Sequence, residues 1–582
     1  MTMILIIMKN FVTWKIGGEA GFGIMAAGTM LTKAFSRRGY HTIASNEYPS
    51  LIRGGHNVIT VGIGTEPFFS LHKTLDILVA LNKETIEIHK NELHEGSFVV
   101  FDPKEGAPVA GDFSCRVERI ALPLSDLVQN LHANVIMRNT VTLGATIALL
   151  GAVFSILSDV IETQFEKKGK TVIDENIAVA KAGYDAVKTT YGSLNGYYLS
   201  TPKQTSEHLV MNGSEAVGIG ALDGGMKFAA IYPMTPINAL ITLFADHKKE
   251  LGITYIQPED EIAGINMAIG ASLAGVRSMV ATSGGGFSLM VEGLSLSGVI
   301  EVPLVINLGM RPGPATGMPT WTEQGELLFS VFSGHGEFPR IILAPGDVTE
   351  SYLLARQAFD LASLYQIPVF ILTDKYLNES QWCVDKSVFD APPTPQEGKR
   401  VSKAEIPEDF KRYDMSPSDG VSKRSFPGME GGLYIANSYE HDEKGFTTED
   451  PMGRTSMADK RLKKRETIIN NSPMPSVYGD EEAKLTFVSF GSTKGPILEA
   501  MKLLKEKGIS SKLIHFSWVY PLNGGKVKEL LRNEKRLIDV EGNGTGQLAK
   551  LLMQESGIEI KEKLLKYNGR QWEPEEIADA IS

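Results

Sequence analysis

The sequence predicts an α/β protein made of several doubly wound, mostly parallel sheet domains. Strand-like and helix-like segments alternate near the N-terminus, in the middle of the chain and near the C-terminus. The boundaries between the segments are clearest in the middle of the chain. At 582 residues the chain is too long for one compact domain, and about 150 residues per domain suggests roughly four. A hydrophobic fraction of 43% and a charged fraction of 22% are typical of a soluble protein with several well-filled cores.

The first predicted domain spans residues 10–192. Apolar, β-rich segments alternate there with helical spacing, which favours a mostly parallel layer. The apolar stretch from Val141 to Leu157 contains threonine, serine and several small residues. It is shorter than the roughly 20 apolar residues that a membrane span needs, so we interpret it as a buried helix. The expected strands lie at 11–18, 41–45, 57–64, 75–81 and 97–103.

The second predicted domain spans residues 206–380 and has the clearest alternation. A doubly wound sheet of this kind binds its ligands beyond the carboxyl ends of its strands. The expected strands lie at 228–232, 278–283, 304–310, 340–345 and 368–374, and helices are expected at 214–225, from Pro236, from Glu261, after Gly286 and from Asp347.

Residues 381–482 form a predicted irregular polar arm, because proline and charged residues replace the alternation. A dense basic run near its end is interpreted as a solvated helix face rather than a nucleic-acid patch. This run consists of Arg461, Lys463, Lys464 and Arg465. A last, smaller α/β domain is expected from 483 to 582.

Charge and cysteine content exclude several classes of function. A net charge of −11 argues against a general nucleic-acid binder. Cys115 and Cys383 lie far apart with no CxxC partner, so this chain cannot supply an all-thiolate iron–sulfur or zinc site. Two cysteines in so long a chain indicate a reducing interior, and we expect a cytoplasmic protein. The apolar start lacks the features of a signal peptide, and the first residue is either Met1 or Met8.

The segment from Ile231 to Asn238, IYPMTPIN, carries the first candidate side chain. Pro233 and Pro236 bias the residues before them toward extended geometry, which holds Thr235 where a strand ends. One interpretation makes Thr235 the N-cap of a helix that has Pro236 at its first position. The other makes its hydroxyl a ligand contact.

Glu261 is the second candidate. It opens a helix rich in glycine and alanine, small residues that allow another backbone to approach closely. A carboxylate in a first helical turn is favoured by the helix dipole alone. The functional alternative is a carboxyl held at the mouth of a crevice.

Arg311 is the third candidate, because it directly follows a strand and precedes a loop of glycine, proline and threonine. A guanidinium in that place suits a planar carboxylate, which it can bind through two hydrogen bonds, although a plain surface arginine remains an alternative. Hydroxyls at Thr316 and Thr320 could add neutral donors.

Two glycine clusters carry less weight. GGEAGFG, Gly17 to Gly23, lies between a strand and a helix but lacks the spacing of a dinucleotide motif. SGGGF, Ser283 to Phe287, could cradle a phosphate at a helix N-terminus or simply make a tight turn.

Taken together, the segments resemble the fused gamma-alpha subunit of a 2-oxoacid:ferredoxin oxidoreductase, and the 2-oxoglutarate type fits best. IYPMTPIN resembles the family's Tyr-Pro-Ile-Thr-Pro element with Met234 in place of isoleucine, and TSGGGFSLMVEGL has Gly285 where proline is common. GGEAGFG and EYPSLIRGGHN resemble the gamma domain, although Glu19 and Ala20 interrupt its usual Gly-Gln. The remaining matching segments are PEDEIAGINMAIGASLAG, RPGPATGMPT and LTFVSFGS through VEGNGTGQL, the last resembling a transketolase C-terminal domain.

The resemblance implies roles for these side chains. Glu261 would hydrogen-bond the aminopyrimidine of thiamine diphosphate and promote loss of its C2 proton. Arg311 would hold the substrate carboxylate, and Thr235, Thr320 and Thr316 would donate hydrogen bonds to the substrate. The expected reaction is the oxidative decarboxylation of a 2-oxoacid with coenzyme A, which yields an acyl-CoA, carbon dioxide and reduced ferredoxin.

The resemblance also implies partners. Mg2+, the diphosphate and a 4Fe-4S cluster would lie on a separate beta subunit, ferredoxin would accept the electrons, and an alpha-beta heterodimer or its dimer would be the active form. Neither nucleic acid nor a membrane is expected. Three alternatives remain open: a non-catalytic scaffold or regulatory subunit, an oxidoreductase for pyruvate or branched 2-oxoacids, and an unrelated dinucleotide or acyl-CoA ligase enzyme.

Overall fold

The computed structural model describes residues 7–51, 54–192, 197–203, 207–402, 404 and 406–581. Its contacts divide the chain into two compact units. The first comprises Met1–Met211, Ser380–Asp390 and Glu573–Ile581, and the second Asn212–Glu379 and Ala391–Trp572. The four-part division drawn from the sequence stays a prediction.

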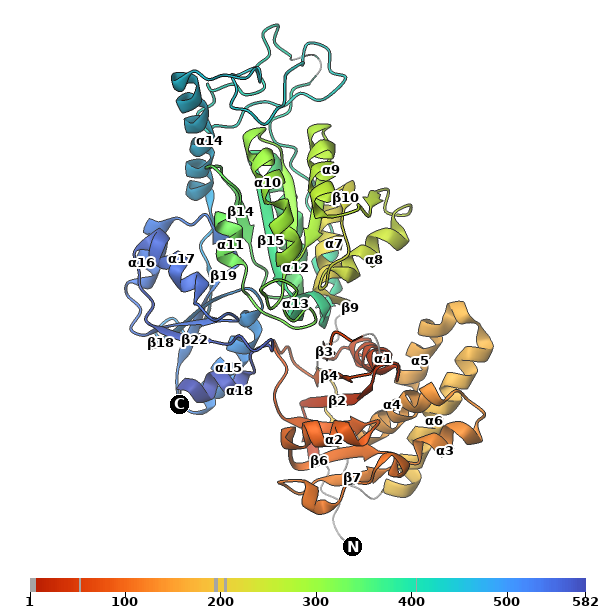
Figure 1. The fold of residues 1–582 in the computed structure, drawn as a ribbon. Helices are drawn as coiled ribbons and strands as arrows, with labels where there is room; N and C mark the ends of the chain where they lie inside the picture. The colour runs from red at the N-terminus through yellow and green to blue at the C-terminus, as the bar shows by residue number, and fades with distance from the viewer. Residues whose placement is uncertain are drawn as a thin grey trace. The chain divides into compact units, whose positions relative to one another are not determined.

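The predicted α/β class is confirmed, because each unit has its own sheet covered by helices (Figure 1). No helix in the described part of the chain is both long enough and apolar enough to cross a membrane.

The first unit contains an eight-stranded sheet in the order β7-β6-β5-β2-β4-β3-β16-β9. The strands from β7 to β2 pair in parallel, whereas β4 pairs antiparallel with β2 and with β3, and β16 pairs antiparallel with β3. The sheet is therefore mixed rather than mostly parallel. The eight residues between β3 and β4 are too few for the crossover that parallel strands need. The strands are β2 (Phe11–Glu19), β3 (His41–Glu47), β4 (His56–Gly64), β5 (Leu75–Ala80), β6 (Leu93–Phe101), β7 (Glu118–Ala121), β9 (His208–Asn212) and β16 (Gln381–Asp385); β1 (Ile7–Lys9) and β8 (Tyr197–Leu199) pair separately.

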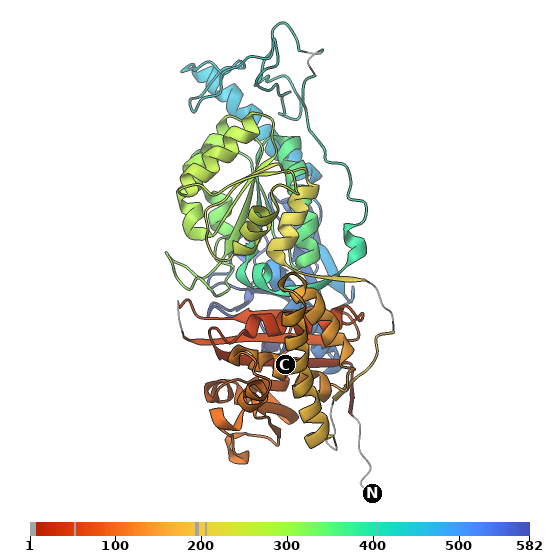
Figure 2. The same ribbon diagram turned by 90° about the vertical axis from the view of Figure 1, so that its right-hand side faces the viewer.

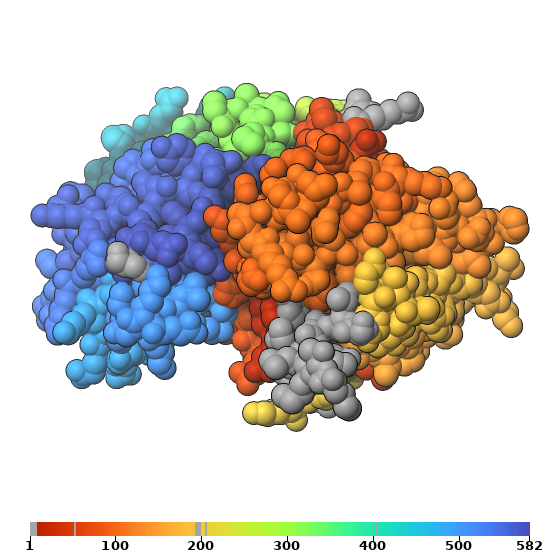
Figure 3. Space-filling view, turned by 90° about the horizontal axis from the view of Figure 1, so that it is seen from below, coloured from red at the N-terminus to blue at the C-terminus, as the bar shows by residue number. Residues whose placement is uncertain are grey.

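The sheet of the first unit and the helices packed on it share one main hydrophobic core. Most of the surface of this unit is drawn in red to yellow in Figure 3. The segment Val141 to Leu157, expected as one buried helix, is divided between two helices because Gly151 takes a left-handed conformation between them, with φ of 65°. The first of the two, α4, is buried along almost its entire length, as expected. The helices are α1 (Ile24–Ser36), α2 (Lys83–His89), α3 (Leu124–Asn130), α4 (Arg138–Leu149), α5 (Ser155–Phe165), α6 (Lys170–Tyr191) and α18 (Pro574–Ile581).

The second unit is built on a seven-stranded sheet in the order β11-β10-β12-β13-β15-β14-β20, with helices on both faces (Figures 1 and 2). All neighbours are parallel except β14 and β20. The strands are β10 (Phe228–Ala230), β11 (Thr254–Ile256), β12 (Ser278–Thr282), β13 (Leu304–Met310), β14 (Ile341–Leu343), β15 (Pro368–Asp374) and β20 (Trp518–Tyr520). The helices are α7 (Gly213–Asp223), α8 (Asn238–His247), α9 (Glu261–Leu273), α10 (Gly284–Val299), α11 (Leu327–Phe332), α12 (Val348–Tyr365) and α13 (Lys375–Glu379).

The strand order creates a switch point between β10 and β12. The chain leaves β10 in one direction to form β11 and then crosses back to form β12 on the other side of β10. In open α/β sheets, ligands bind beyond the carboxyl ends of the strands at such a point. The loops that follow β10, β11, β12 and β13 therefore meet where a site is expected.

The C-terminal part of this unit adds a five-stranded sheet in the order β17-β19-β18-β21-β22. One continuous hydrophobic core runs from the seven-stranded sheet into this part. The new strands are β17 (Ser476–Gly479), β18 (Leu485–Phe490), β19 (Ser511–Phe516), β21 (Leu537–Glu541) and β22 (Glu562–Leu565), and the helices are α15 (Lys494–Glu506), α16 (Gly524–Leu531) and α17 (Gln547–Ser556).

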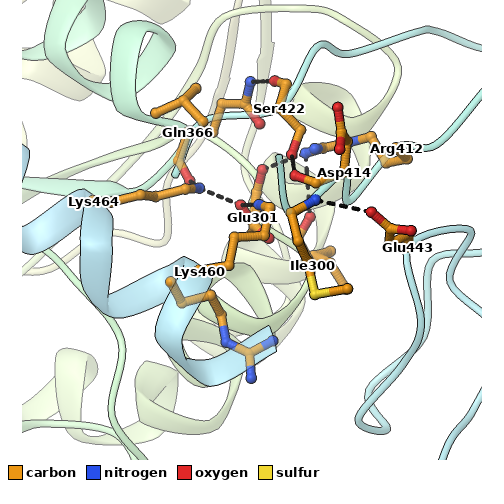
Figure 4. Close-up of polar contacts among 12 residues, drawn as sticks. Ile300, Glu301, Gln366, Arg412, Asp414, Ser422, Glu443, Lys460 and Lys464 are labelled. Atoms are coloured by element: carbon orange, nitrogen blue, oxygen red, sulfur yellow. Dashed lines mark hydrogen bonds and ion pairs between the residues drawn. The ribbon is translucent and has the colours of Figure 1, made fainter. Parts of the chain in front are cut away.

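The predicted polar arm begins with β16, which belongs to the sheet of the first unit, is irregular from about residue 391 to about 450, and then forms the long helix α14 (Pro451–Asn471). The prediction that its basic run is a solvated helix face is wrong for Arg461 and Lys464, which are buried, whereas Lys463 is exposed. Lys464 and Lys460 both pair with Glu301, the residue that follows α10 and its cap (Figure 4). The arm is thus fixed to the seven-stranded sheet domain by a buried ionic cluster.

Candidate functional site

Thr235 lies in the loop that follows β10, and it is half-buried. The interpretation of Thr235 as the cap of a helix starting at Pro236 is wrong. The residues Met234 to Ile237 form a turn, in which the amide of Ile237 donates to the carbonyl of Met234 at 3.0 Å, and α8 begins only at Asn238. The hydroxyl of Thr235 accepts a hydrogen bond of 3.4 Å from the Asn238 side chain.

Glu261 begins α9, as the sequence predicts, but it does not cap the helix. The preceding residue, Asp260, does so by accepting a 2.8 Å hydrogen bond from the amide of Ala263. Glu261 is 3% exposed, and its Oε1 atom is buried with no hydrogen-bond partner. A buried carboxylate oxygen without a donor is costly, so its presence points to a partner supplied from outside the chain.

The N-terminus of α10 lies directly against Glu261. A Cβ atom at Gly286 would stand 2.3 Å from Glu261 Oε1 and 2.1 Å from the hydroxyl oxygen of Thr282. The third glycine of SGGGF is therefore required for Glu261 to occupy its position. The helix itself begins at Gly284, whereas the sequence predicts a start after Gly286.

Arg311 follows β13, and its Nη1 atom donates a 2.7 Å hydrogen bond to the carbonyl oxygen of Thr235. The structure thus brings these two predicted residues together at the end of the sheet. Arg311 is half-buried, and this burial lowers the pKa of its guanidinium, an effect that the nearby Glu326 opposes. Part of its side chain remains accessible to an incoming carboxylate.

The two threonines of the Arg311 loop differ. Thr320 is buried, and its hydroxyl has no hydrogen-bond partner, whereas Thr316 is exposed. Thr320, like Glu261, therefore has a buried side-chain oxygen without a hydrogen-bond partner, whereas Thr316 does not.

Two polar groups in this region received no role from the sequence: the hydroxyl of Ser283, named only as the first residue of SGGGF, and the carboxyl of Glu326. The hydroxyl of Ser283, which caps α10 by position but makes no side-chain cap bond, is buried without a partner. Glu326 Oε2 is also buried without a partner. Burial and the neighbouring Glu323 raise the pKa of Glu326 to about 8, against the lowering effect of Arg311. In the sequence Glu326 merely precedes an apolar helical segment, α11, which gives no hint of this environment.

The gamma-like glycine cluster lies in the first unit, between β2 and α1, where Gly21 and Gly23 adopt left-handed conformations. Of the segment EYPSLIRGGHN, Ile52 and Arg53 lie outside the described residues. The two cysteines are free thiols.

Three family models match the chain in order. Residues 13–186 match "Pyruvate ferredoxin/flavodoxin oxidoreductase", residues 219–460 match "Pyruvate flavodoxin/ferredoxin oxidoreductase, thiamine diP-bdg", and residues 477–556 match "Transketolase, C-terminal domain". The candidate site lies inside the second match.

Individual proteins agree with these models. The chain is 33% identical to 2-oxoacid:ferredoxin oxidoreductase 2, subunit alpha, of Aeropyrum pernix, over 97% of this chain and 96% of that one. It is 29% identical to the 2-oxoglutarate synthase subunit KorA of Methanothermobacter thermautotrophicus, over 65% of this chain and 98% of that one. A solved structure of 2-oxoglutarate:ferredoxin oxidoreductase from Magnetococcus marinus, with 2-oxoglutarate, coenzyme A and succinyl-CoA bound, aligns with a TM-score of 0.92 and 29% identity over 98% of this chain and 99% of that one.

The order of the three matches, the identity over nearly the full length of both chains and the shared fold lead to one conclusion. The chain belongs to the 2-oxoacid:ferredoxin oxidoreductase family, as an alpha subunit with a thiamine-diphosphate-binding domain.

Proposed function

We propose that this chain forms one side of the active site of a 2-oxoglutarate-preferring oxidoreductase and that Glu261 is its acid–base group toward thiamine diphosphate. The observation that carries the proposal is the buried, unpartnered Oε1 of Glu261 at the switch point of the sheet. The family relation makes the cofactor's aminopyrimidine the natural partner of that oxygen.

The residues present fit such a cofactor. Gly286 leaves room beside Glu261, and Ser283 and Thr320 add further unsatisfied hydroxyls to the same region. When bound, thiamine diphosphate supplies the nucleophilic carbon and the electron sink for decarboxylation. Glu261 would hold and share a proton at the pyrimidine ring nitrogen, and its burial keeps competing water away from that proton.

Arg311 would bind the carboxylate of the 2-oxoacid. Its hydrogen bond to the Thr235 carbonyl fixes one side of the guanidinium and leaves the other donors free for a planar anion. Thr235 and Thr320 would donate hydrogen bonds to the substrate, and Thr316, which is exposed, would reach it only from the rim of the loop.

A separate beta subunit would complete the site by holding the diphosphate, Mg2+ and a 4Fe-4S cluster, while coenzyme A and ferredoxin would serve as co-substrate and electron acceptor. The outer surfaces of α9 and α10 support this division. The apolar side chains of Ile262, Met267 and Leu289 are exposed there, on the two helices that carry the site. Gly270 is also exposed, and a Cβ atom added to it would have no other atom within 4 Å. Such a small, apolar surface suits close approach of a partner subunit.

The preference for 2-oxoglutarate rests on two relatives. The Methanothermobacter protein is named a 2-oxoglutarate synthase subunit, and the Magnetococcus structure holds 2-oxoglutarate and succinyl-CoA. Arg311 would read only the carboxylate that all 2-oxoacids share, so the side-chain preference depends on other residues of the assembled site.

The test is to purify this chain alone and with a co-expressed beta chain, and to measure viologen reduction with coenzyme A and each of 2-oxoglutarate, pyruvate and a branched 2-oxoacid. The isolated chain should be colourless and inactive. The complex should be active, with the highest kcat/KM for 2-oxoglutarate. Activity of the chain alone would contradict the divided site, and a higher kcat/KM for pyruvate would contradict the substrate preference only.

A further inference from the structure

A second carboxyl with a buried oxygen, Glu326, lies against the first turn of α10. A Cβ atom at Gly284 would stand 2.5 Å from Glu326 Oε1, so the carboxyl is in contact with the helix terminus. Its other oxygen, Oε2, is buried without a hydrogen-bond partner. Glu326 and Glu261 thus occupy the spaces beside two glycines of the same triplet, Gly284 and Gly286.

The backbone around Glu326 is held on both sides by the C-terminal part of the same unit. The backbone amide of Gln324 donates a 2.7 Å hydrogen bond to the carbonyl oxygen of Gly542, and the amide of Gly542 donates one of 2.7 Å to the side-chain oxygen of Gln324. The Gln547 side chain donates to the carbonyl of Gly325 at 2.7 Å and accepts from the amide of Leu328 at 2.8 Å. These hydrogen bonds hold the backbone on both sides of Glu326 in place.

The charged groups that act on Glu326 are Arg311, at the end of β13, and Glu323, in its own loop. The element packed against it, the α10 terminus, presents only glycine and serine there. Glu323 is half-buried, and burial raises its pKa as well. Two acidic groups and one guanidinium therefore share a poorly solvated region.

We propose that Glu326 is a positioning residue that acts through Arg311, because its carboxyl and the carboxylate of the 2-oxoacid compete for the same guanidinium charge. Substrate then binds to the form of the site in which Glu326 carries a proton, and binding to the ionised form takes up one proton from solvent. This inference rests on the proposed role of Arg311 and adds a function for Glu326 that the reaction itself does not require.

The sign of the pH effect follows from linkage. The pKa of Glu326 is about 8 in this structure, and a substrate carboxylate nearby raises it further, because like charges disfavour ionisation. Below that pH the group is mostly protonated, so the KM for the 2-oxoacid should be flat. Above it, each unit of pH should raise KM by up to about tenfold, until the raised pKa of the bound state is reached.

The experiment measures KM and kcat of the assembled alpha-beta complex between about pH 6.5 and about pH 9.5 for wild type, Glu326→Gln and Glu323→Gln, with 2-oxoglutarate and with pyruvate. Glutamine keeps the shape of Glu326 without the charge, so Glu326→Gln should give a KM that stays flat at high pH. Glu323→Gln removes a charge that raises the pKa of Glu326, so its KM should begin to rise at a lower pH than in wild type. Both substrates should respond alike, because both present the shared carboxylate.

A rise of KM with pH that persists unchanged in Glu326→Gln would overturn the proposal. The proposal would also fail if KM began to rise at the same pH in Glu323→Gln as in wild type. If Glu326→Gln fails to assemble, the Glu323→Gln shift still decides. Arg311→Ala separates this inference from the proposed function. An unchanged KM in Arg311→Ala would rule out the substrate role of Arg311. If KM is raised in Arg311→Ala but depends on pH in Glu326→Gln as it does in wild type, only the role of Glu326 is ruled out.

Discussion

The second unit buries carboxyl groups in two contrasting ways. Glu301 accepts hydrogen bonds of 2.7 Å from Lys460 Nζ at both of its oxygens and pairs with Lys464 as well, and its backbone carbonyl accepts a 2.7 Å bond from Arg412 (Figure 4). Its neighbours hold the pKa of Glu301 well below the usual range despite complete burial. Glu261 and Glu326, at the other location, each leave a buried oxygen without a partner.

This difference separates a carboxyl that serves the fold from one that serves chemistry. The surrounding cations offset the free-energy cost of desolvating Glu301, and two of them connect the arm helix α14 to the sheet domain. No such compensation surrounds Glu261, and its cost persists because a ligand supplies the missing donor when it binds. The comparison predicts that removing each charge has opposite consequences for stability and for activity.

The largest expected effect is on stability, at Glu301. Glu301→Gln leaves Lys460, Lys464 and Arg412 buried without their anion, which should cost about 3–5 kcal/mol. Urea denaturation and hydrogen exchange of the α14 amides would measure the loss, with the exposed Glu408→Gln of the same arm as the control. Because the pKa of Glu301 is depressed, its stabilising contribution is present above the unfolded value of 4.5 and is lost only in stronger acid. The destabilisation by Glu301→Gln should therefore still be present at about pH 5.5, above the range in which Glu301 takes up its proton. A midpoint like that of Glu408→Gln would contradict the structural role.

Glu261→Gln should show the reverse behaviour. In the assembled complex kcat should fall by roughly 100-fold or more, because the group that shares a proton with the cofactor is gone. Stability should be unchanged or slightly increased, since an unpaired buried carboxyl has been neutralised. The exposed Glu337→Gln is the matched control. Wild-type turnover in Glu261→Gln, or a destabilisation as large as that of Glu301→Gln, would remove the distinction between the two carboxyls.

The same contrast explains which features could be predicted from the sequence. Glu261 and Arg311 directly follow or open regular elements, so local pattern was enough to select them. The basic run of α14 was misread because its partner, Glu301, is far away in sequence, and a charged helix face then looks solvated. Glu326 was missed for the same reason: the groups that define its environment, Gly284 and Arg311, come from other loops that only the folded sheet brings together.

A smaller effect is expected at Arg311, where the charge is only half-buried and one donor is already used by Thr235. Arg311→Ala should raise the KM for the 2-oxoacid by about 10- to 100-fold, the range of a lost charge-assisted hydrogen bond, with less change in kcat. Steady-state kinetics of the complex would show this, with the exposed Arg532→Ala as the control. A fall in kcat at constant KM would assign Arg311 to the chemical step instead of to binding.

The smallest expected effect comes from the glycine triplet that separates the two unpartnered carboxyls. A methyl group at Gly286 would come within 2.3 Å of Glu261 Oε1 and must displace it, whereas at Gly285 the nearest atom is the carbonyl of Ala315 at 3.8 Å. Gly286→Ala should therefore lower kcat by roughly tenfold through misplacement of Glu261. Gly285→Ala should leave kcat unchanged and stabilise α10 by up to about 1 kcal/mol, because alanine is the better helix former. Equal kinetic effects of the two substitutions would mean that the position of Glu261 is not what the third glycine protects.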